Sequence, residues 1–239
     1  MKLSSSFSWF RSGLSHYARA SWQAWRSGLS EQGFLLKLLI TPGLFILYSA
    51  VTQHLGTYVE LRKGVQLSDP LLYLFPAGDY SVPIFILLYT SLSLTVLTHL
   101  DRPRVILRII EMHFLVAVIR QLCILAIALE PPVGLIVLRD VFLENTVYPR
   151  HSPLTKDLFF SGHVASIWLY FLCAERRAMR RLLIAATVGM SFMILAMRVH
   201  YTYDVYGALL ITTLIYKAPA WYRQYAFEGR LARIRSRWK

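Results

Sequence analysis

The last third of the chain contains a histidine and a carboxylate whose spacing could support nucleophilic chemistry. His200 and Asp204 are four residues apart in the stretch His200-Tyr201-Thr202-Tyr203-Asp204. Residues at this spacing share one face of a helix. A carboxylate in that position can accept a hydrogen bond from the imidazole Nδ1, which fixes the tautomer and leaves the other ring nitrogen as a nucleophile. We therefore expect His200 to attack a substrate and Asp204 to orient the His200 imidazole.

A second histidine, His163, stands at the start of an earlier apolar run, directly after Ser161-Gly162. An imidazole in different surroundings from His200 can stay protonated and donate to a leaving oxygen. Backbone N–H groups at a helix start can bind phosphate oxygens, and Gly162 permits close backbone approach. Together the two stretches predict a phosphoryl-transfer site that uses a phosphohistidine and no metal or cofactor. The plainer alternative is that each histidine is only a polar residue at a helix end.

Other polar residues are candidates for contacts with the substrate. Arg120 lies inside an apolar run, and an arginine at such a depth should face the interior of a bundle. We expect it to contact phosphate or to act as the electrostatic partner of Asp204 or Asp157. Tyr201 could line a headgroup pocket through cation–π contact, although a place in the aromatic belt of the membrane interface is the default explanation. The predicted substrate-binding residues are Arg120, Asp157, Ser161, Gly162 and Tyr201.

The composition indicates where this site must be built. Of 239 residues, 56% are hydrophobic and 16% charged, and the apolar residues are gathered in blocks between charged clusters. A soluble domain of this size needs more charge to cover its surface, so the pattern predicts a polytopic membrane protein. The net charge of +13 does not indicate nucleic acid, because the basic residues lie between apolar blocks and in the tails. Anionic lipid headgroups are the expected partners of the basic tails.

The apolar blocks predict an all-α fold with six transmembrane helices. Residues 1–33 are basic and rich in tryptophan, and they predict an amphipathic helix lying in the headgroup layer. Residues 34–219 are expected to form the catalytic domain, and 220–239 a basic cytosolic tail. The six runs, each close to the roughly 20 residues that cross a bilayer, are 34–54, 82–99, 105–129, 159–174, 182–198 and 202–219.

The placement of lysine and arginine predicts the orientation of these runs. With the N-terminus inside, 17 of the 26 basic residues fall in inner segments and six in outer ones. This bias predicts that both termini are cytosolic. His163 then begins a run on the outer side and His200 follows the outer end of the next run. The count did not use the histidines, so their placement on one face is independent support for a shared site.

The same residues resemble a known family. Ser161-Gly162-His163 and the stretch from His200 to Asp204 are similar to the third and fourth motifs of the sphingomyelin synthase family, the transferase branch of the type-2 phosphatidic acid phosphatase superfamily. Asp157 also matches, at four residues before the serine. The likeness covers roughly residues 105–217. The chain departs from the family at two pairs of positions just before these motifs, namely Thr155-Lys156 and Arg198-Val199.

The resemblance implies roles for the three candidate catalytic residues. His200, oriented by Asp204, would attack the phosphorus of a donor phospholipid, and His163 would protonate the departing diacylglycerol. His163 would then deprotonate an acceptor such as ceramide. The short chain suits a bacterial member in the inner membrane, with the site facing the periplasm.

The expected function is thus transfer of phosphocholine or phosphoethanolamine from a glycerophospholipid to a ceramide- or diacylglycerol-like acceptor. One alternative is a lipid phosphatase or phospholipase C-type hydrolase that uses water at the same site. Another is a non-catalytic membrane protein that retains the fold.

Overall fold

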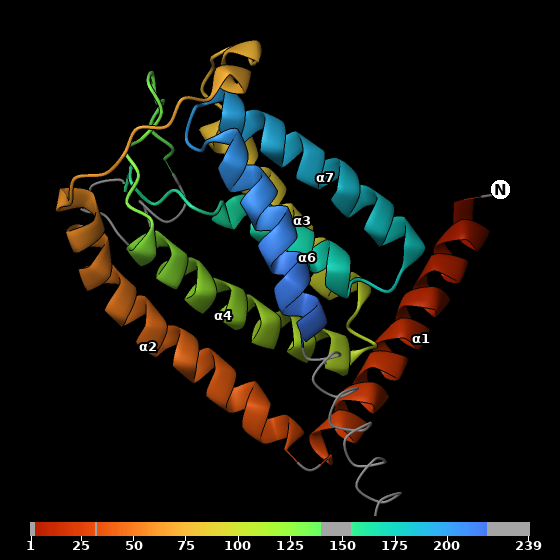
Figure 1. Ribbon diagram of the computed structural model, residues 1–239. Coiled ribbons are helices and arrows are strands. Elements are labelled where there is room, and N and C mark those ends of the chain that lie inside the picture. The colour runs from red at the N-terminus through yellow and green to blue at the C-terminus, as the bar shows by residue number, and fades with distance from the viewer. Residues whose placement is uncertain (1–2, 32, 140–153, 219–239) are drawn as a thin grey trace, which may run out of the picture.

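The computed structural model describes residues 3–31, 33–139 and 154–218, and these residues form helices and loops without a strand. Figure 1 shows their arrangement. The helices are α1 (Leu3–Leu29), α2 (Phe34–Leu61), the short 3-10 helix η1 (Pro70–Leu74), α3 (Ser81–Thr98), α4 (Pro103–Ala126), α6 (Gly162–Cys173), α7 (Arg177–Ala196) and a helix over 202–218.

The apolar runs become helices, but the predicted count of six spans is not confirmed. Four helices are long and apolar enough to cross a membrane, namely α2, α3, α4 and α7. The run predicted as a span at 159–174 forms α6, which has 12 residues and is about 18 Å long, against about 30 Å for the hydrocarbon core. It is shorter than expected because residues 154–161 form a loop. The sixth run forms the 202–218 helix within the part of the chain that the structure describes.

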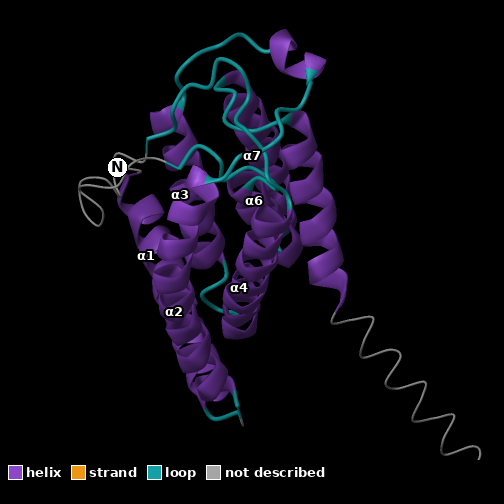
Figure 2. Cartoon of the chain, turned by 60° about the vertical axis from the view of Figure 1, so that its left-hand side comes forward, coloured by secondary structure: helices purple, strands orange, loops and turns teal. Residues whose placement is uncertain are grey.

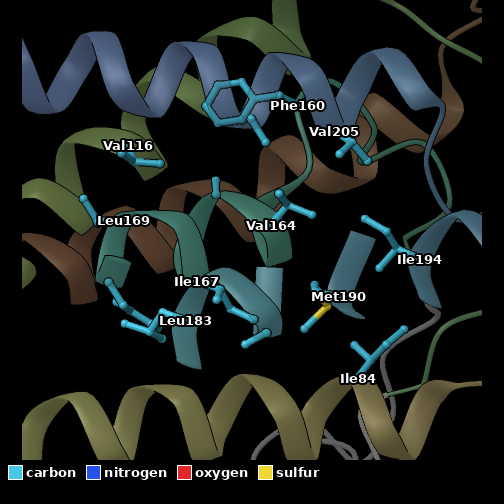
Figure 3. Packing of buried hydrophobic residues seen from close by; sticks show 14 of the residues in the cluster. Ile84, Val116, Phe160, Val164, Ile167, Leu169, Leu183, Met190, Ile194 and Val205 are labelled. Atoms are coloured by element: carbon cyan, nitrogen blue, oxygen red, sulfur yellow. The ribbon is translucent and has the colours of Figure 1, made fainter. Parts of the chain in front are cut away.

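Helix α6 lies at the centre of the bundle. Val164, Ile167 and Leu169 are fully buried and contribute to one cluster with apolar side chains of α3, α4 and α7 (Figure 3). A helix that is apolar on all sides is typical of such a buried position. Because α6 contacts α3, α4 and α7, the residues at its N-terminus are held by the core of the protein. The labelled partners in Figure 3 include Ile84, Val116, Leu183, Met190 and Ile194.

The long loops gather at one end of the bundle (Figure 2). The loops after α2 and α4 are joined by backbone hydrogen bonds from Val65 N to Ala128 O (2.9 Å) and from Glu130 N to Val65 O (3.0 Å). The loop after α4 is also joined to the end of α7, because Ile136 N donates to Met197 O at 2.8 Å. These links connect the loops that lie next to the start of the 202–218 helix.

Helix α1 packs across the opposite end of the bundle (Figure 1). The Tyr17 hydroxyl donates to Leu97 O (2.7 Å) in the last turn of α3, and Trp25 Nε1 donates to Leu100 O (2.9 Å) in the turn that follows α3. Arg104, in the first turn of α4, pairs with Glu31 just after α1. The leader is therefore a helix, as predicted, and it is docked on the bundle; its position in the headgroup layer stays a prediction. The basic tail at 220–239 lies outside the described residues.

Candidate active site

The His200–Asp204 pair has the geometry that the spacing predicts. His200 Nδ1 lies 3.2 Å from Asp204 Oδ2, and the exposed fractions of the two residues are 2% and 0%. The same carboxylate oxygen accepts the N–H of Tyr201 at 2.9 Å. Asp204 lies in the first turn of the 202–218 helix, and His200 lies in the loop just before it. With a proton on Nδ1, the histidine donates to Asp204 and its Nε2 lone pair is available for attack.

A buried carboxylate from a distant loop holds the start of the same helix. Asp69 Oδ2 accepts the N–H of Thr202 at 2.6 Å, and Oδ1 accepts the Thr202 hydroxyl at 3.1 Å. Asp69 is 5% exposed and lies between α2 and η1. A carboxylate at a helix N-terminus satisfies orphan N–H groups and interacts favourably with the helix dipole. Sequence reasoning missed Asp69, because a capping residue is recognised only when it directly precedes its helix.

The first histidine stretch lies against the second. Ser161 N donates to the backbone oxygen of Asp204 at 3.2 Å, so the N-terminus of α6 adjoins the start of the 202–218 helix. His163 is in the first turn of α6, and its ring packs edge-on against Phe85 of α3 with centroids 5.6 Å apart. The Ser161 hydroxyl is fully buried and has no hydrogen-bond partner within the described part of the chain. Such an unpaired donor beside a helix N-terminus suits a phosphate oxygen.

Arg120 of α4 organises the loop that leads into α6. Its Nη2 lies 3.0 Å from Asp157 Oδ2, and its Nε donates to Phe160 O at 2.6 Å. This contact explains the glycine at 162, since a Cβ there would lie 3.1 Å from Arg120 Nε. Of the partners that the sequence allowed for Arg120, the structure shows Asp157. Its Nη1 makes no hydrogen bond to any described residue and could reach an anionic ligand.

Asp157 is the charged partner of Arg120 beside the start of α6. Burial raises the pKa of the Asp157 carboxyl, but the charge and hydrogen bond of Arg120, with smaller contributions from His200 and His163, hold that pKa below its usual value. The two stretches are joined in the structure by the backbone hydrogen bond from Ser161 N to Asp204 O.

Tyr201 makes contacts that differ from those expected of a headgroup ligand. Its side chain is 1% exposed, and its hydroxyl accepts the N–H of Leu67 (3.2 Å) and donates to Glu130 O (2.9 Å). Burial raises the pKa of the Tyr201 phenol. These bonds tie three loops together, so the observed role of Tyr201 is structural. Its contact with substrate stays a prediction.

Residues of both pairs that depart from the family, Thr155-Lys156 and Arg198-Val199, make contacts with other parts of the chain. Glu60, at the end of α2, accepts the backbone N–H groups of Thr155 (3.0 Å) and Lys156 (3.1 Å). Lys156 Nζ lies 2.8 Å from Glu130 Oε1, and the Lys156 side chain lowers the pKa of Glu130. Arg198 has a positive φ of 55° and places its guanidinium 5.3 Å from the Tyr73 ring centre. Glu60 is a second residue that no local pattern indicated.

The described residues contain no group of three or more histidine, cysteine or acidic side chains that could hold a metal ion. What the site offers is a buried oriented imidazole, a second imidazole at a helix N-terminus, an unpaired hydroxyl and a nearby arginine. These are the parts that phosphoryl transfer by covalent catalysis requires.

Comparison with known proteins gives one match. No curated protein and no solved structure matches the chain significantly. A family model described as "PAP2 superfamily C-terminal" matches residues 156–221, a segment that contains Asp157, both histidines and Asp204. This match supports the relation of the chain to the type-2 phosphatidic acid phosphatase superfamily and to its lipid phosphatase and phosphotransferase chemistry.

Proposed function

We propose that the protein is a membrane phosphotransferase that moves phosphocholine or phosphoethanolamine from a glycerophospholipid to a ceramide- or diacylglycerol-like acceptor. The observation that carries this proposal is the buried His200–Asp204 pair, with its 3.2 Å contact, placed beside the helix start that holds His163. The superfamily match is in keeping with such chemistry. The transferase branch is favoured by the likeness of both histidine stretches to the sphingomyelin synthase family.

In the first step, His200 Nε2 attacks the phosphorus of the donor. A P–N bond forms and the P–O bond to diacylglycerol breaks. His163, protonated at the outset, gives its proton to the departing oxygen, so neutral diacylglycerol leaves. Asp204 keeps the Nδ1 proton on His200 in place and stabilises the positive charge of the phosphorylated imidazole.

In the second step, the acceptor hydroxyl attacks the phosphohistidine. His163, now neutral, takes the hydroxyl proton as the acceptor oxygen bonds to phosphorus. The P–N bond breaks, and both histidines return to their starting protonation states. No net proton is gained or lost over the two steps.

The charge on the phosphoryl oxygens needs stabilisation in both steps. The N-terminus of α6, the unpaired Ser161 hydroxyl and Arg120 Nη1 are the groups suited to this. Positioned donors of this kind supply much of the catalysis in phosphoryl transfer. Arg120 also forms an ion pair with Asp157. The opposite charges of the two side chains leave this pair with no net charge.

Hydrolysis is the second candidate, because water can replace the acceptor in the second step. The products would then be diacylglycerol and a free phospho-headgroup, as in a phospholipase C reaction, or phosphate from a phosphomonoester. The position of the site at the end of the bundle where the long loops gather (Figure 2) favours access of water. The superfamily name itself refers to phosphatases.

The two candidates are separated by one experiment on purified protein. Phosphatidylcholine or phosphatidylethanolamine labelled in the headgroup is incubated with and without ceramide or diacylglycerol. Transfer predicts labelled lipid that forms only with the acceptor, whereas release of water-soluble label at an undiminished rate identifies a hydrolase. His200→Ala should abolish either reaction, and His54→Ala, which removes an exposed histidine of α2, should not. Unchanged turnover in His200→Ala would contradict both.

The membrane placement belongs to the same proposal. We propose six spans with both termini cytosolic, in a bacterial inner membrane, so that the site faces the periplasm. The four helices long enough to cross a membrane support a polytopic protein. The basic leader and tail would bind anionic lipid headgroups of the inner leaflet.

A further inference from the structure

A cavity of about 220 Å³ lies beside the candidate site, between α2, α4 and the loop before α6. Figure 1 shows α2 alongside α4, on the outside of the bundle. Gln53 and Gly56 of α2 face Arg120 and Gln121 of α4 across this space, and Leu154 and Asp157 close its end. The volume is below the roughly 300–1,000 Å³ of pockets for drug-sized ligands. It therefore suits the polar end of a lipid rather than a whole lipid.

The Arg120–Asp157 ion pair belongs both to the wall of the cavity and to the entry of α6, the helix that carries His163. Arg120 and Asp157 line it, and the same two residues hold the loop that enters α6. The backbone at Gly162, next to His163, comes so near the Arg120 guanidinium that a Cβ would lie 3.1–3.2 Å from it. A hydroxyl bound in the cavity near Arg120 is thus close to the start of α6.

The lining suits a neutral polar group. Arg120 and Asp157 neutralise each other at 3.0 Å. The Gln121 side chain is half-buried and makes no hydrogen bond to the described residues. An amide without a partner is costly at membrane depth, and a lipid hydroxyl or amide would satisfy it. A phosphate, in contrast, is better served by the N-terminus of α6 and the Ser161 hydroxyl.

Helix α2 gives the cavity a route from the bilayer. Its buried residues are few, and its outward side carries exposed apolar side chains such as Ile46, Leu47 and Val51. A hydrocarbon chain can lie along such a surface while its polar end enters between α2 and α4. No soluble ligand would need this arrangement.

We propose that the cavity binds the polar end of a neutral, hydroxyl-bearing lipid and presents its hydroxyl to the histidine pair. This inference rests on the proposed function for the use of that hydroxyl, but binding itself does not depend on turnover. Ceramide as acceptor and diacylglycerol as leaving group share this chemistry, so one cavity would serve both halves of the reaction.

Two glycines of α2 provide a matched pair of variants. A Cβ at Gly56 would meet Leu154 at 3.2 Å, whereas a Cβ at Gly43 meets nothing within 4 Å. Gly56→Leu should fill the cavity, and Gly43→Leu makes the same change in the same helix away from it. Gln121→Leu removes the amide without adding bulk. It replaces Gly56→Leu as the test variant if Gly56→Leu fails to fold. Thermal melting of the purified protein shows whether each variant folds.

The binding test uses full-length His200→Ala protein in detergent, with diazirine-bearing ceramide and diacylglycerol as separate photoprobes. Mass spectrometry should map the label to α2 and α4 around Gly56 and Gln121. Gly56→Leu or Gln121→Leu should reduce labelling by ten-fold or more, and Gly43→Leu should leave it unchanged. Equal labelling of cavity and control variants would overturn the proposal. Labelling by only one probe would assign the cavity to that lipid.

Kinetics distinguish a failure of this inference from a failure of the proposed function. If the protein transfers headgroups and Gly56→Leu leaves the KM for the acceptor unchanged, the cavity is not the acceptor site and the proposed function stands. If cavity-dependent photolabelling is found but no lipid is turned over, the proposed function fails and the binding site stands. The expected result is a KM for the acceptor raised at least ten-fold in Gly56→Leu and unchanged in Gly43→Leu.

Discussion

Asp69 and Thr202 are 133 residues apart in the chain, yet the Asp69 carboxylate accepts both the N–H (2.6 Å) and the hydroxyl (3.1 Å) of Thr202. Through this contact, the loop after α2 fixes the first turn of the helix that carries Asp204. The His200–Asp204 pair is therefore positioned by a part of the chain far from either residue.

Asp69→Ala should lower kcat by one to two orders of magnitude, because the helix start that orients His200 loses its cap. Loss of the cap should also cost about 0.5–2 kcal/mol of stability. A positioning role predicts that the KM for donor changes little and that Asp69→Asn, which keeps one acceptor oxygen, recovers part of the kcat. A thermal melt and steady-state kinetics on the same samples measure both effects. If Asp69→Ala lowered stability but left kcat at the wild-type value, Asp69 would be structural only.

Asp204→Asn should depress kcat by about 10⁴-fold, the scale seen when an orienting carboxylate is lost from a histidine. An amide in place of the carboxylate stabilises the wrong tautomer, in which Nε2 carries the proton. His163→Ala and His200→Ala should abolish turnover, and donor affinity, measured by competition with a labelled lipid, should persist in all three variants. A loss of binding in place of a loss of kcat would assign these residues to substrate binding.

The Arg120–Asp157 pair predicts a specific dependence of stability on pH. The pKa of Asp157 is lower in the folded protein than its ordinary value. The stability that it contributes is therefore complete above about pH 3.9 and is lost as the pH falls through the folded-state pKa. Removing one partner of a buried pair costs about 3–5 kcal/mol, but the Asp157 side chain is 37% exposed, so screening reduces the expected loss to about 1–2 kcal/mol.

The measurement is the Tm of wild type and of Asp157→Asn as a function of pH. The wild type should melt higher by a constant margin from pH 5 to 8, and the margin should shrink as the solution is made more acidic than pH 4. A margin that grew on acidification would contradict the direction of the pKa shift.

The orientation can be tested with a membrane-impermeant maleimide on intact cells. After Cys123 and Cys173 are replaced by alanine, a cysteine is introduced at Lys63 or at Arg177, which are exposed positions at the start of the loop after α2 and of α7. Lys63→Cys should be labelled from outside, and Arg177→Cys only after the membrane is opened. The reverse pattern would place the site in the cytosol.

The parts of the site that follow local rules were predictable from sequence. The predicted contact between His200 and Asp204 is present, although His200 lies in the loop just before the helix and the two residues do not share a helix face. Arg120 inside an apolar run pairs with Asp157, one of the partners expected for an arginine at that depth. The apolar runs predicted helices because their hydrophobicity is a property of each segment by itself.

Contacts between distant loops could not be predicted in the same way. Asp69 and Glu60 act on residues more than 90 positions away, and nothing in their neighbours indicates a partner. The apolar run at 159–174 begins before α6 does, because Phe159 and Phe160 are as apolar as the helix that follows. Tertiary contacts determine where the loop ends and α6 begins. These contacts are the hydrogen bonds from Arg120 to the Phe160 carbonyl and from Ser161 N to the Asp204 carbonyl.

The central claim, that His200 is phosphorylated during turnover, is tested most directly by trapping the intermediate. Purified protein is mixed rapidly with donor lipid labelled at the headgroup phosphate, without acceptor, and quenched in base, in which phosphohistidine persists. The account predicts label on the protein that maps to His200, is absent in His200→Ala and disappears on addition of ceramide as labelled product forms. Full turnover with no protein-bound label at any quench time, or label retained in His200→Ala, would contradict it.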